Sequence, residues 1–203
     1  WQDLSGNDNN ASQTEINKRP IYKIDQINNL PVIRYIGTES LIISDNTSLQ
    51  ISPNLTIFAI VDLNETTSGV DNITTIFSNE LNSNNRNWWL VQWDGIWYSR
   101  ATENETVLNS FSDNQASTEP TMLTLLLDGS MNLFVDGQTQ TTGDNYSSID
   151  TQSSLITIGR QSDGEIRHWH GDIAEIIVYD RALSDEERQA VEQYLGEKWL
   201  GWS

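Results

Sequence analysis

Aromatic side chains crowd one short stretch of the chain. Flat indole and phenol rings offer apolar surface with a polar edge, which suits contact with the apolar faces of sugar rings. The alternative is that such rings pack in the core as cross-strand pairs. The crowded residues are Trp88, Trp89, Trp93, Trp97 and Tyr98.

The spacing of these rings separates them into two sets. Along a strand successive side chains point to opposite faces. Trp89 and Trp93 therefore share one face, and Trp88 lies on the other. Both faces cannot border the same core, so at least one set of indoles is expected to be partly exposed or covered by a loop.

Basic residues are scarce, with 11 in a chain of 203, and several of them lie near aromatic residues. Arginine and histidine can hydrogen-bond to hydroxyl groups or a carboxylate. Their alternative roles are solvent contact or a local salt bridge. Two histidines flank Trp169, but a transition-metal site needs a third ligand that the sequence does not supply. We predict a ligand-binding site made of Trp93, Trp97, Tyr98, Arg100, Arg160, His168 and Trp169.

The chain has a net charge of -18. A negative field of this size repels phosphate backbones and anionic lipid, so we expect neither nucleic-acid binding nor membrane insertion. The same charge favours divalent cations, although it serves solubility equally well. The absence of cysteine excludes disulfides, zinc-thiolate sites and thiol nucleophiles.

Catalytic patterns are missing from the sequence. A retaining glycosidase needs two carboxyl groups about 5–5.5 Å apart, and the aromatic segments 87–93 and 96–100 contain no acidic residue. No nucleophile elbow or phosphate-binding loop occurs. We therefore expect no enzymatic activity.

Many short apolar runs separated by turns predict an all-β fold. The turn Asp94-Gly95 between two aromatic runs is a strong hairpin signal. The first thirty residues are rich in turn formers and are expected to be irregular. Strands are predicted at 30–36, 41–43, 55–61, 74–78, 87–93, 96–100, 123–127, 133–135, 155–160 and 171–179.

One helix is predicted at the end of the chain. Ser184 and Glu187 have the spacing of a capping box. Val191, Tyr194, Leu195 and Trp199 then fall largely on one face, which we expect to pack on the outside of a sheet. The fold class predicted is an all-β, two-sheet antiparallel jelly-roll sandwich with one C-terminal helix, and residues 1–203 form a single domain.

The two ends of the chain resemble bacterial laminin-G-like, concanavalin A-like lectin–glucanase domains. Residues 1–7 look like the W-x-D-x-S-G-N start of that family. Residues 171–184 are similar to its G-x-I-x-E-x-x-x-Y-x-R-A-L-S ending, which is the most specific part of the likeness. The hairpin at 125–137 and Ile158-Gly159-Arg160 resemble its central hairpin and late strand.

This resemblance implies a jelly roll, often with a calcium ion at the rim. Asp3 and Asp172 lie within the two terminal motifs and are the predicted calcium ligands. Such domains recur in large secreted or surface proteins and bind glycans or proteins, or serve as structural modules. We expect a monomeric, adhesin-like extracellular module that was cut from a longer protein and that binds a glycan or an extracellular protein with the help of calcium. The alternatives are a purely structural or interaction domain and, less favoured, a polysaccharide-active enzyme.

Overall fold

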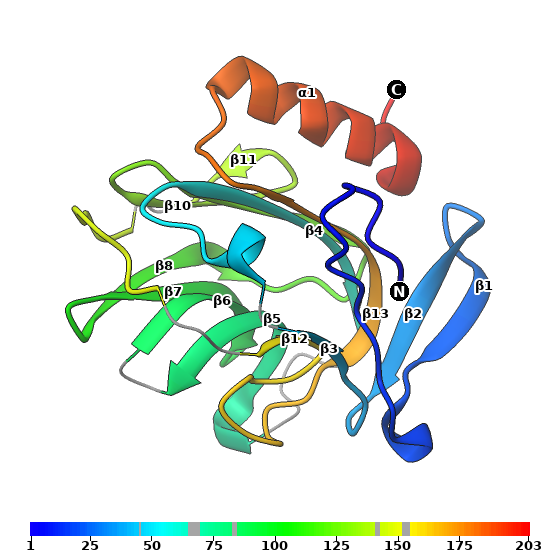
Figure 1. Ribbon diagram of the computed structural model, residues 1–203. Coiled ribbons are helices and arrows are strands. Elements are labelled where there is room, and N and C mark those ends of the chain that lie inside the picture. Colours follow the sequence, from blue (N-terminus) through cyan, green and yellow to red (C-terminus); the bar gives the residue numbers. More distant parts are fainter. Residues whose placement is uncertain (45, 65–69, 83–84, 141–142, 152–154) are drawn as a thin grey trace.

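The computed structural model describes residues 1–44, 46–64, 70–82, 85–140, 143–151 and 155–203, and its strands form two antiparallel sheets (Figure 1). The seven-stranded sheet has the order β1 (Ile21–Ile27), β2 (Leu30–Ile36), β13 (His170–Tyr179), β4 (Leu55–Leu63), β9 (Thr121–Leu127), β10 (Met131–Val135), β11 (Gln138–Thr139). The six-stranded sheet has the order β3 (Leu41–Ile43), β12 (Ile156–Ile158), β5 (Ile73–Asn82), β6 (Asn85–Trp93), β7 (Ile96–Glu103), β8 (Thr106–Gln115). The predicted jelly-roll sandwich is confirmed.

The main core lies between the two sheets, and alternation along β4 shows how it is built. Ile57 and Ala59 face this core, whereas Phe58 and Ile60 point to the opposite side, where the C-terminal helix covers them. All four side chains are fully buried. A strand that is covered on both faces needs apolar residues at every position, which explains the continuous apolar run in the sequence.

The C-terminal helix α1 (Asp185–Leu195) packs on the outer face of the seven-stranded sheet (Figure 1). Its capping box is present: Ser184 Oγ accepts from the Glu187 backbone N–H, and the Glu187 carboxylate accepts from the Ser184 N–H. A π-helical segment, η4 (Gly196–Leu200), continues it and ends at Gly201, whose φ of 70° is left-handed. Leu195 and Trp199 anchor this element on the sheet.

Three strands, β1, β8 and the short β11, lie where the sequence did not predict them. The first thirty residues were expected to be irregular, yet β1 forms a hairpin with β2 because Asn28 and Asn29 both adopt left-handed backbone angles at the turn. The polar strand β8 pairs with β7 and forms one edge of the six-stranded sheet. Short 3-10 helices occupy η1 (Ile16–Lys18), η2 (Thr47–Leu49) and η3 (Val70–Asn72).

The predicted hairpin at Asp94-Gly95 is confirmed, with φ angles of 49° and 82° that place both residues in the left-handed region. Its strands, β6 and β7, lie in the middle of the six-stranded sheet, away from the helix (Figure 1). Within the described ranges, no helix is long and apolar enough to cross a lipid bilayer.

Candidate ligand-binding site

The predicted division of the tryptophans between two faces is confirmed. Trp88 and Leu90 lie in the main core, and Trp89 and Val91 lie in a separate apolar cluster. Trp93 packs against that second cluster and is partly exposed. The outer face of the six-stranded sheet therefore has its own aromatic surface, which no other sheet covers.

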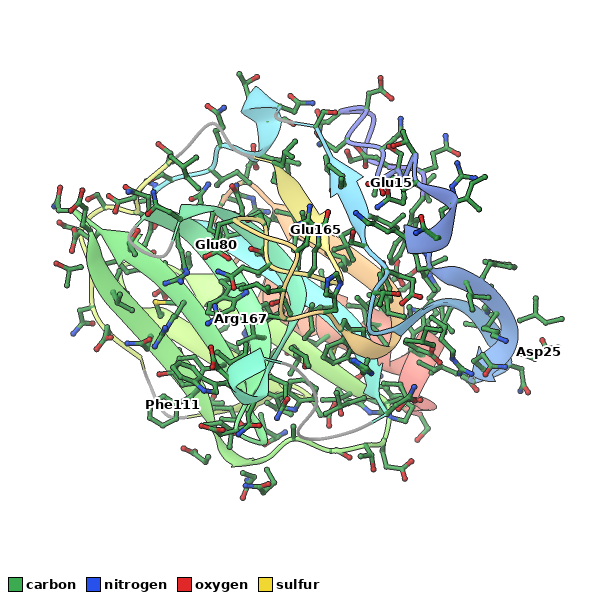
Figure 2. All side chains as sticks on the ribbon, turned by 90° about the horizontal axis from the view of Figure 1, so that it is seen from below. Glu15, Asp25, Glu80, Phe111, Glu165 and Arg167 are labelled. Atoms are coloured by element: carbon green, nitrogen blue, oxygen red, sulfur yellow. The ribbon has the colours of Figure 1, made fainter. Side chains whose placement is uncertain are left out.

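A row of three rings crosses this outer face from β6 to β8. The ring centroids of Trp93 and Tyr98 are 5.2 Å apart, and Tyr98 stacks on Phe111 at 5.7 Å with an interplanar angle of 20°. Register explains the row, because Tyr98 of β7 pairs directly with Phe111 of β8. Phe111 is 40% exposed and lies at the margin of the molecule in Figure 2, so the row ends in a ring that is open to solvent.

Arg100 lies over this row. Its guanidinium carbon is 4.5 Å from the Trp93 ring centroid and 5.5 Å from that of Tyr98. Its Nε donates to Asn109 Oδ1 at 2.8 Å, which fixes the plane of the guanidinium group. Burial lowers the pKa of Arg100, and the positive charges of Arg86 and Arg167 lower it further.

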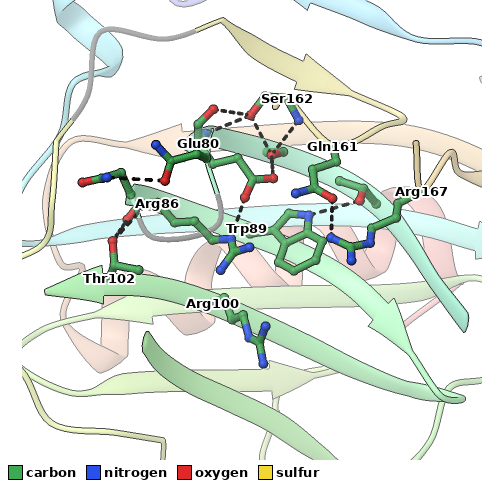
Figure 3. Close-up of polar contacts among 12 residues, drawn as sticks. Glu80, Arg86, Trp89, Arg100, Thr102, Gln161, Ser162 and Arg167 are labelled. Carbon is green, nitrogen blue, oxygen red and sulfur yellow. Dashed lines mark hydrogen bonds and ion pairs between the residues drawn. The ribbon is translucent and has the colours of Figure 1, made fainter. Parts of the chain in front are cut away.

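The other end of the face is built around the fully buried Trp89. Arg86 and Arg167 cover its ring, with guanidinium carbons 4.8 and 5.4 Å from the centroid. The Trp89 Nε1–H donates to Thr75 Oγ1 at 3.1 Å. Figure 3 shows the side chains of Arg86 and Arg167 reaching this indole from two sides, whereas Arg100 lies below it in the view and points away.

A buried ion pair holds Arg86 in place. Its Nε lies 2.5 Å from Glu80 Oε2, and the two side chains are 3% and 0% exposed. Ser78 Oγ donates to the other carboxylate oxygen at 3.1 Å, and the Arg86 backbone N–H donates to Thr102 Oγ1 at 2.8 Å (Figure 3). Burial raises the pKa of Glu80 in spite of the neighbouring guanidinium group.

Arg167 comes from the loop between β12 and β13. Its left-handed φ of 56° and the bond from Thr75 N to its carbonyl oxygen, 2.9 Å long, direct the loop over the sheet. The side chain donates to Gln161 Oε1 and forms an exposed 3.3 Å ion pair with Asp71. We call the surface formed by Arg86, Trp89, Trp93, Tyr98, Arg100, Phe111 and Arg167 the tryptophan–arginine face.

Three of the seven predicted ligand-binding residues lie together on this face: Trp93, Tyr98 and Arg100. Two others lie in the main core, because Trp97 is 1% exposed and Trp169 is fully buried. Their rings are 6.3 Å apart and pack between the sheets. Neither ring reaches the surface, so their assignment to the ligand site is corrected.

The remaining two predicted residues have structural contacts. Arg160 is 6% exposed and donates to the carbonyl oxygens of Gln161 and Gly164, so it holds its own loop rather than a ligand. His168 is half-buried, and its Nδ1 lies 3.3 Å from the Glu39 carbonyl oxygen. The tryptophan–arginine face does not include either residue.

The two predicted calcium ligands have other partners. Both carboxylate oxygens of Asp172 accept from Arg34, each at 2.7 Å, and the Asp172 side chain is 1% exposed. Asp3 accepts from the backbone N–H groups of Ser5 and Asn9, which lowers its pKa. No group of three or more His, Asp or Glu residues suited to a metal occurs in the described part of the chain. The residues present at Asp172 do not fit a cation, because a guanidinium group already occupies both oxygens.

Apart from this face, a hollow of about 610 Å³ lies between the N-terminal segment, β13 and Trp199. Two of its acidic groups, Asp3 and Glu175, are already engaged. Glu175 accepts from Lys198 Nζ at 2.9 Å and from Trp199 Nε1 at 2.5 Å, and Asp3 is bonded as described above. These two carboxylates are thus satisfied internally, and we assign no ligand to this groove.

The predicted ligand-binding site left out four members of the face: Arg86, Trp89, Phe111 and Arg167. Phe111 lies on the polar strand β8, which the sequence did not predict. Asn109 and Phe111 are two residues apart and share one face of that strand, and Phe111 pairs with Tyr98 of β7. No local signal joins Arg86 to Arg167, because they lie far apart in sequence and meet only over Trp89.

Comparison with known proteins agrees with this architecture. A sequence model of the concanavalin A-like lectin/glucanases superfamily matches residues 37–187. No curated protein sequence matches the chain significantly.

Similar solved structures include the binding domain of Paraclostridial Mosquitocidal Protein 1, with 18% identity and a TM-score of 0.71 over 95% of this chain and 49% of that one. The receptor binding domain of botulinum neurotoxin D has 15% identity and a TM-score of 0.70 over the same shares. A botulinum neurotoxin serotype D ligand binding domain in complex with N-acetylneuraminic acid has 14% identity and a TM-score of 0.69 over 95% of this chain and 48% of that one. The chain spans about half the length of these structures, and the likeness establishes the fold.

Proposed function

The chain belongs to the concanavalin A-like lectin/glucanases superfamily, and we propose that it is a non-catalytic module that binds a glycan on the tryptophan–arginine face. The observation that carries this proposal is the partly exposed row Trp93–Tyr98–Phe111 with Arg100 across it. Aromatic rings contact the apolar faces of sugars, and a fixed guanidinium group supplies directional donors to hydroxyl or acidic groups. The similar toxin structures are binding domains, which supports binding as the role.

The charges on the face also favour binding over catalysis. Glycoside hydrolysis uses two carboxyl groups that flank the scissile bond. Of the acidic groups described beside this face, Glu80 is buried in its pair with Arg86 and Asp71 pairs with Arg167 at the surface. We propose an extracellular or cell-surface, adhesin-like setting, with an extracellular protein ligand or a purely structural role as the alternatives.

Alanine substitution of Trp93 or Tyr98 is expected to weaken glycan binding about tenfold, because each removes a stacking surface worth about 1.4 kcal/mol. The ligand is found first by screening the wild-type protein on a broad glycan array, and affinities are then measured by calorimetry. Tyr194→Ala is the control, since Tyr194 is an exposed ring on α1, outside the face. Wild-type affinity in both face variants would exclude this site, and an array without hits would favour the protein-binding or structural alternative.

Calcium assistance is a separate proposal, which rests on the family likeness and on the net charge of -18. An ion that binds only the native state raises the melting temperature by mass action. We therefore expect melting in millimolar calcium to occur several degrees above melting in excess EDTA. Equal melting temperatures would contradict calcium binding. Glycan binding that persists in EDTA would indicate that the aromatic and arginine residues bind the glycan without calcium.

A further inference from the structure

Arg100 differs from most cationic side chains of this acidic protein. Arg34, Arg86, Arg167, Arg181, Arg188, Lys18 and Lys198 each pair with a carboxylate within 4.0 Å. Within the described ranges, Arg100 has no such pair. Its described partners are the neutral side chain of Asn109, the hydroxyl group of Tyr98, and the rings of Trp93 and Tyr98.

The surroundings of Arg100 increase the cost of an unpaired charge. Desolvation disfavours a half-buried cation, and two further guanidinium groups lie nearby. Arg86 is neutralised by Glu80 and Arg167 by Asp71, so these five charged groups sum to one positive charge. A local positive charge in a chain of net charge -18 would be relieved by a bound anion.

The geometry at Arg100 suits an oxyanion. Asn109 takes the Nε–H, and the guanidinium plane lies over the Trp93 ring. A planar guanidinium group held in this way can present its terminal N–H donors to two oxygens of one carboxylate or sulfate. The partly buried ring of Tyr98 and the exposed ring of Phe111 continue beside it, where the ring of a sugar would stack.

We propose that the ligand of this face is an acidic sugar, whose carboxylate or sulfate group binds Arg100 while its ring stacks on Trp93 and Tyr98. Arg167, with its exposed partner Asp71, forms the side of the same subsite. A sugar fits better than an acidic peptide because three adjoining rings, of which Phe111 is 40% exposed, lie beside Arg100 and offer apolar contact to a sugar ring. This inference rests on the proposed function and adds the charge of the ligand to it.

Matched pairs of glycans test the charge requirement. The carboxylate pair is an oligogalacturonate and its methyl ester, and the sulfate pair is keratan sulfate and its desulfated form. For at least one pair we expect the acidic member to bind about ten- to a hundredfold more tightly, the range expected for losing a charge-assisted contact. The pair that shows the difference tells which acidic group is recognised.

Substitutions assign that preference to one side chain. Arg100→Gln should reduce the ratio of the two affinities to about one, and Arg100→Lys should retain part of it, because lysine keeps the charge but loses the fork geometry. Arg181→Gln is the matched control, since it removes the same charge from an exposed arginine beside α1. An unchanged ratio in Arg100→Gln would overturn the role of Arg100.

A second measurement needs no glycan. Iodide and caesium quenching of tryptophan fluorescence are compared at constant ionic strength, and Trp93→Phe isolates the contribution of Trp93. Iodide should quench Trp93 more strongly than caesium does, despite the net negative charge, and Arg100→Gln should remove the difference. Equal quenching in the wild-type protein would overturn the anion site.

The possible results separate the two proposals. Equal binding of the acidic and neutral members, lost in Trp93→Ala, overturns the acidic ligand and leaves glycan binding in place. No binding to any member of either pair or to the wider array overturns both.

Discussion

Replacing Trp97 with alanine should lower the free energy of unfolding by about 3–5 kcal/mol, the usual cost of truncating a large ring in a packed core. Trp97 is 1% exposed and packs beside Trp169 between the sheets. The substitution removes apolar contacts and leaves a cavity that the surrounding strands can close only in part. Urea denaturation followed by circular dichroism measures the change.

The comparison with Trp93 makes this prediction specific. Trp93 lies four residues earlier in the same hairpin but on the outer face, where it is partly exposed. Because Trp93 is only partly buried, Trp93→Ala should cost less stability than Trp97→Ala, about 1–2 kcal/mol, while reducing glycan affinity. Similar stability losses in the two variants would contradict the assignment of Trp97 to the core and Trp93 to the binding face.

Replacing Arg86 with methionine should also destabilise the protein by about 3–5 kcal/mol, because the carboxylate of Glu80 is then left buried without its counter-charge. The Glu80 side chain is 0% exposed, so solvent cannot take over the role of Arg86. The double variant Glu80→Gln/Arg86→Met removes both charges and should recover most of the loss. If the double variant is no more stable than Arg86→Met, the buried carboxylate is not the cause.

The dependence of this effect on pH has a definite sign. The pKa of Glu80 is already raised by burial, and it should rise further in Arg86→Met, where the lowering effect of the guanidinium group is absent. A carboxyl group whose pKa is higher in the folded state destabilises the fold as pH rises through that pKa. The defect of Arg86→Met should therefore grow as pH rises from the unfolded-state pKa to the raised folded-state pKa of Glu80 and shrink on acidification, and urea titrations across a range of pH measure it.

Local patterns in the sequence determined most of the secondary structure. Strand β2 and the turn at Asp94-Gly95 lie where propensity and turn chemistry predicted them, and the capping box of Ser184 and Glu187 begins the helix. These features depend on neighbours within a few residues, so the sequence alone is enough to find them. Strand β1 was missed because its turn-rich surroundings concealed a hairpin formed by Asn28 and Asn29.

Alternation also separated the indoles correctly, but it could not say which face would be covered. The sequence placed Trp88 and Trp89 on opposite sides of one strand. Only the packing of the second sheet decided that Trp88 and Trp97 enter the core, while Trp93 remains at the surface. This choice depends on contacts between segments far apart in the chain.

The charged groups of the site were decided by tertiary structure for the same reason. Arg100 and Arg160 look alike in sequence, yet Arg160 donates to backbone carbonyl oxygens of its own loop and Arg100 lies on an aromatic row without a carboxylate among its described partners. Asp172, predicted as a calcium ligand, is held by Arg34 of a neighbouring strand. The sequence determined which side chains were available and which strand faces they share, and the folding of the sheets determined their partners, because an ion pair or a stacked ring depends on distance in space.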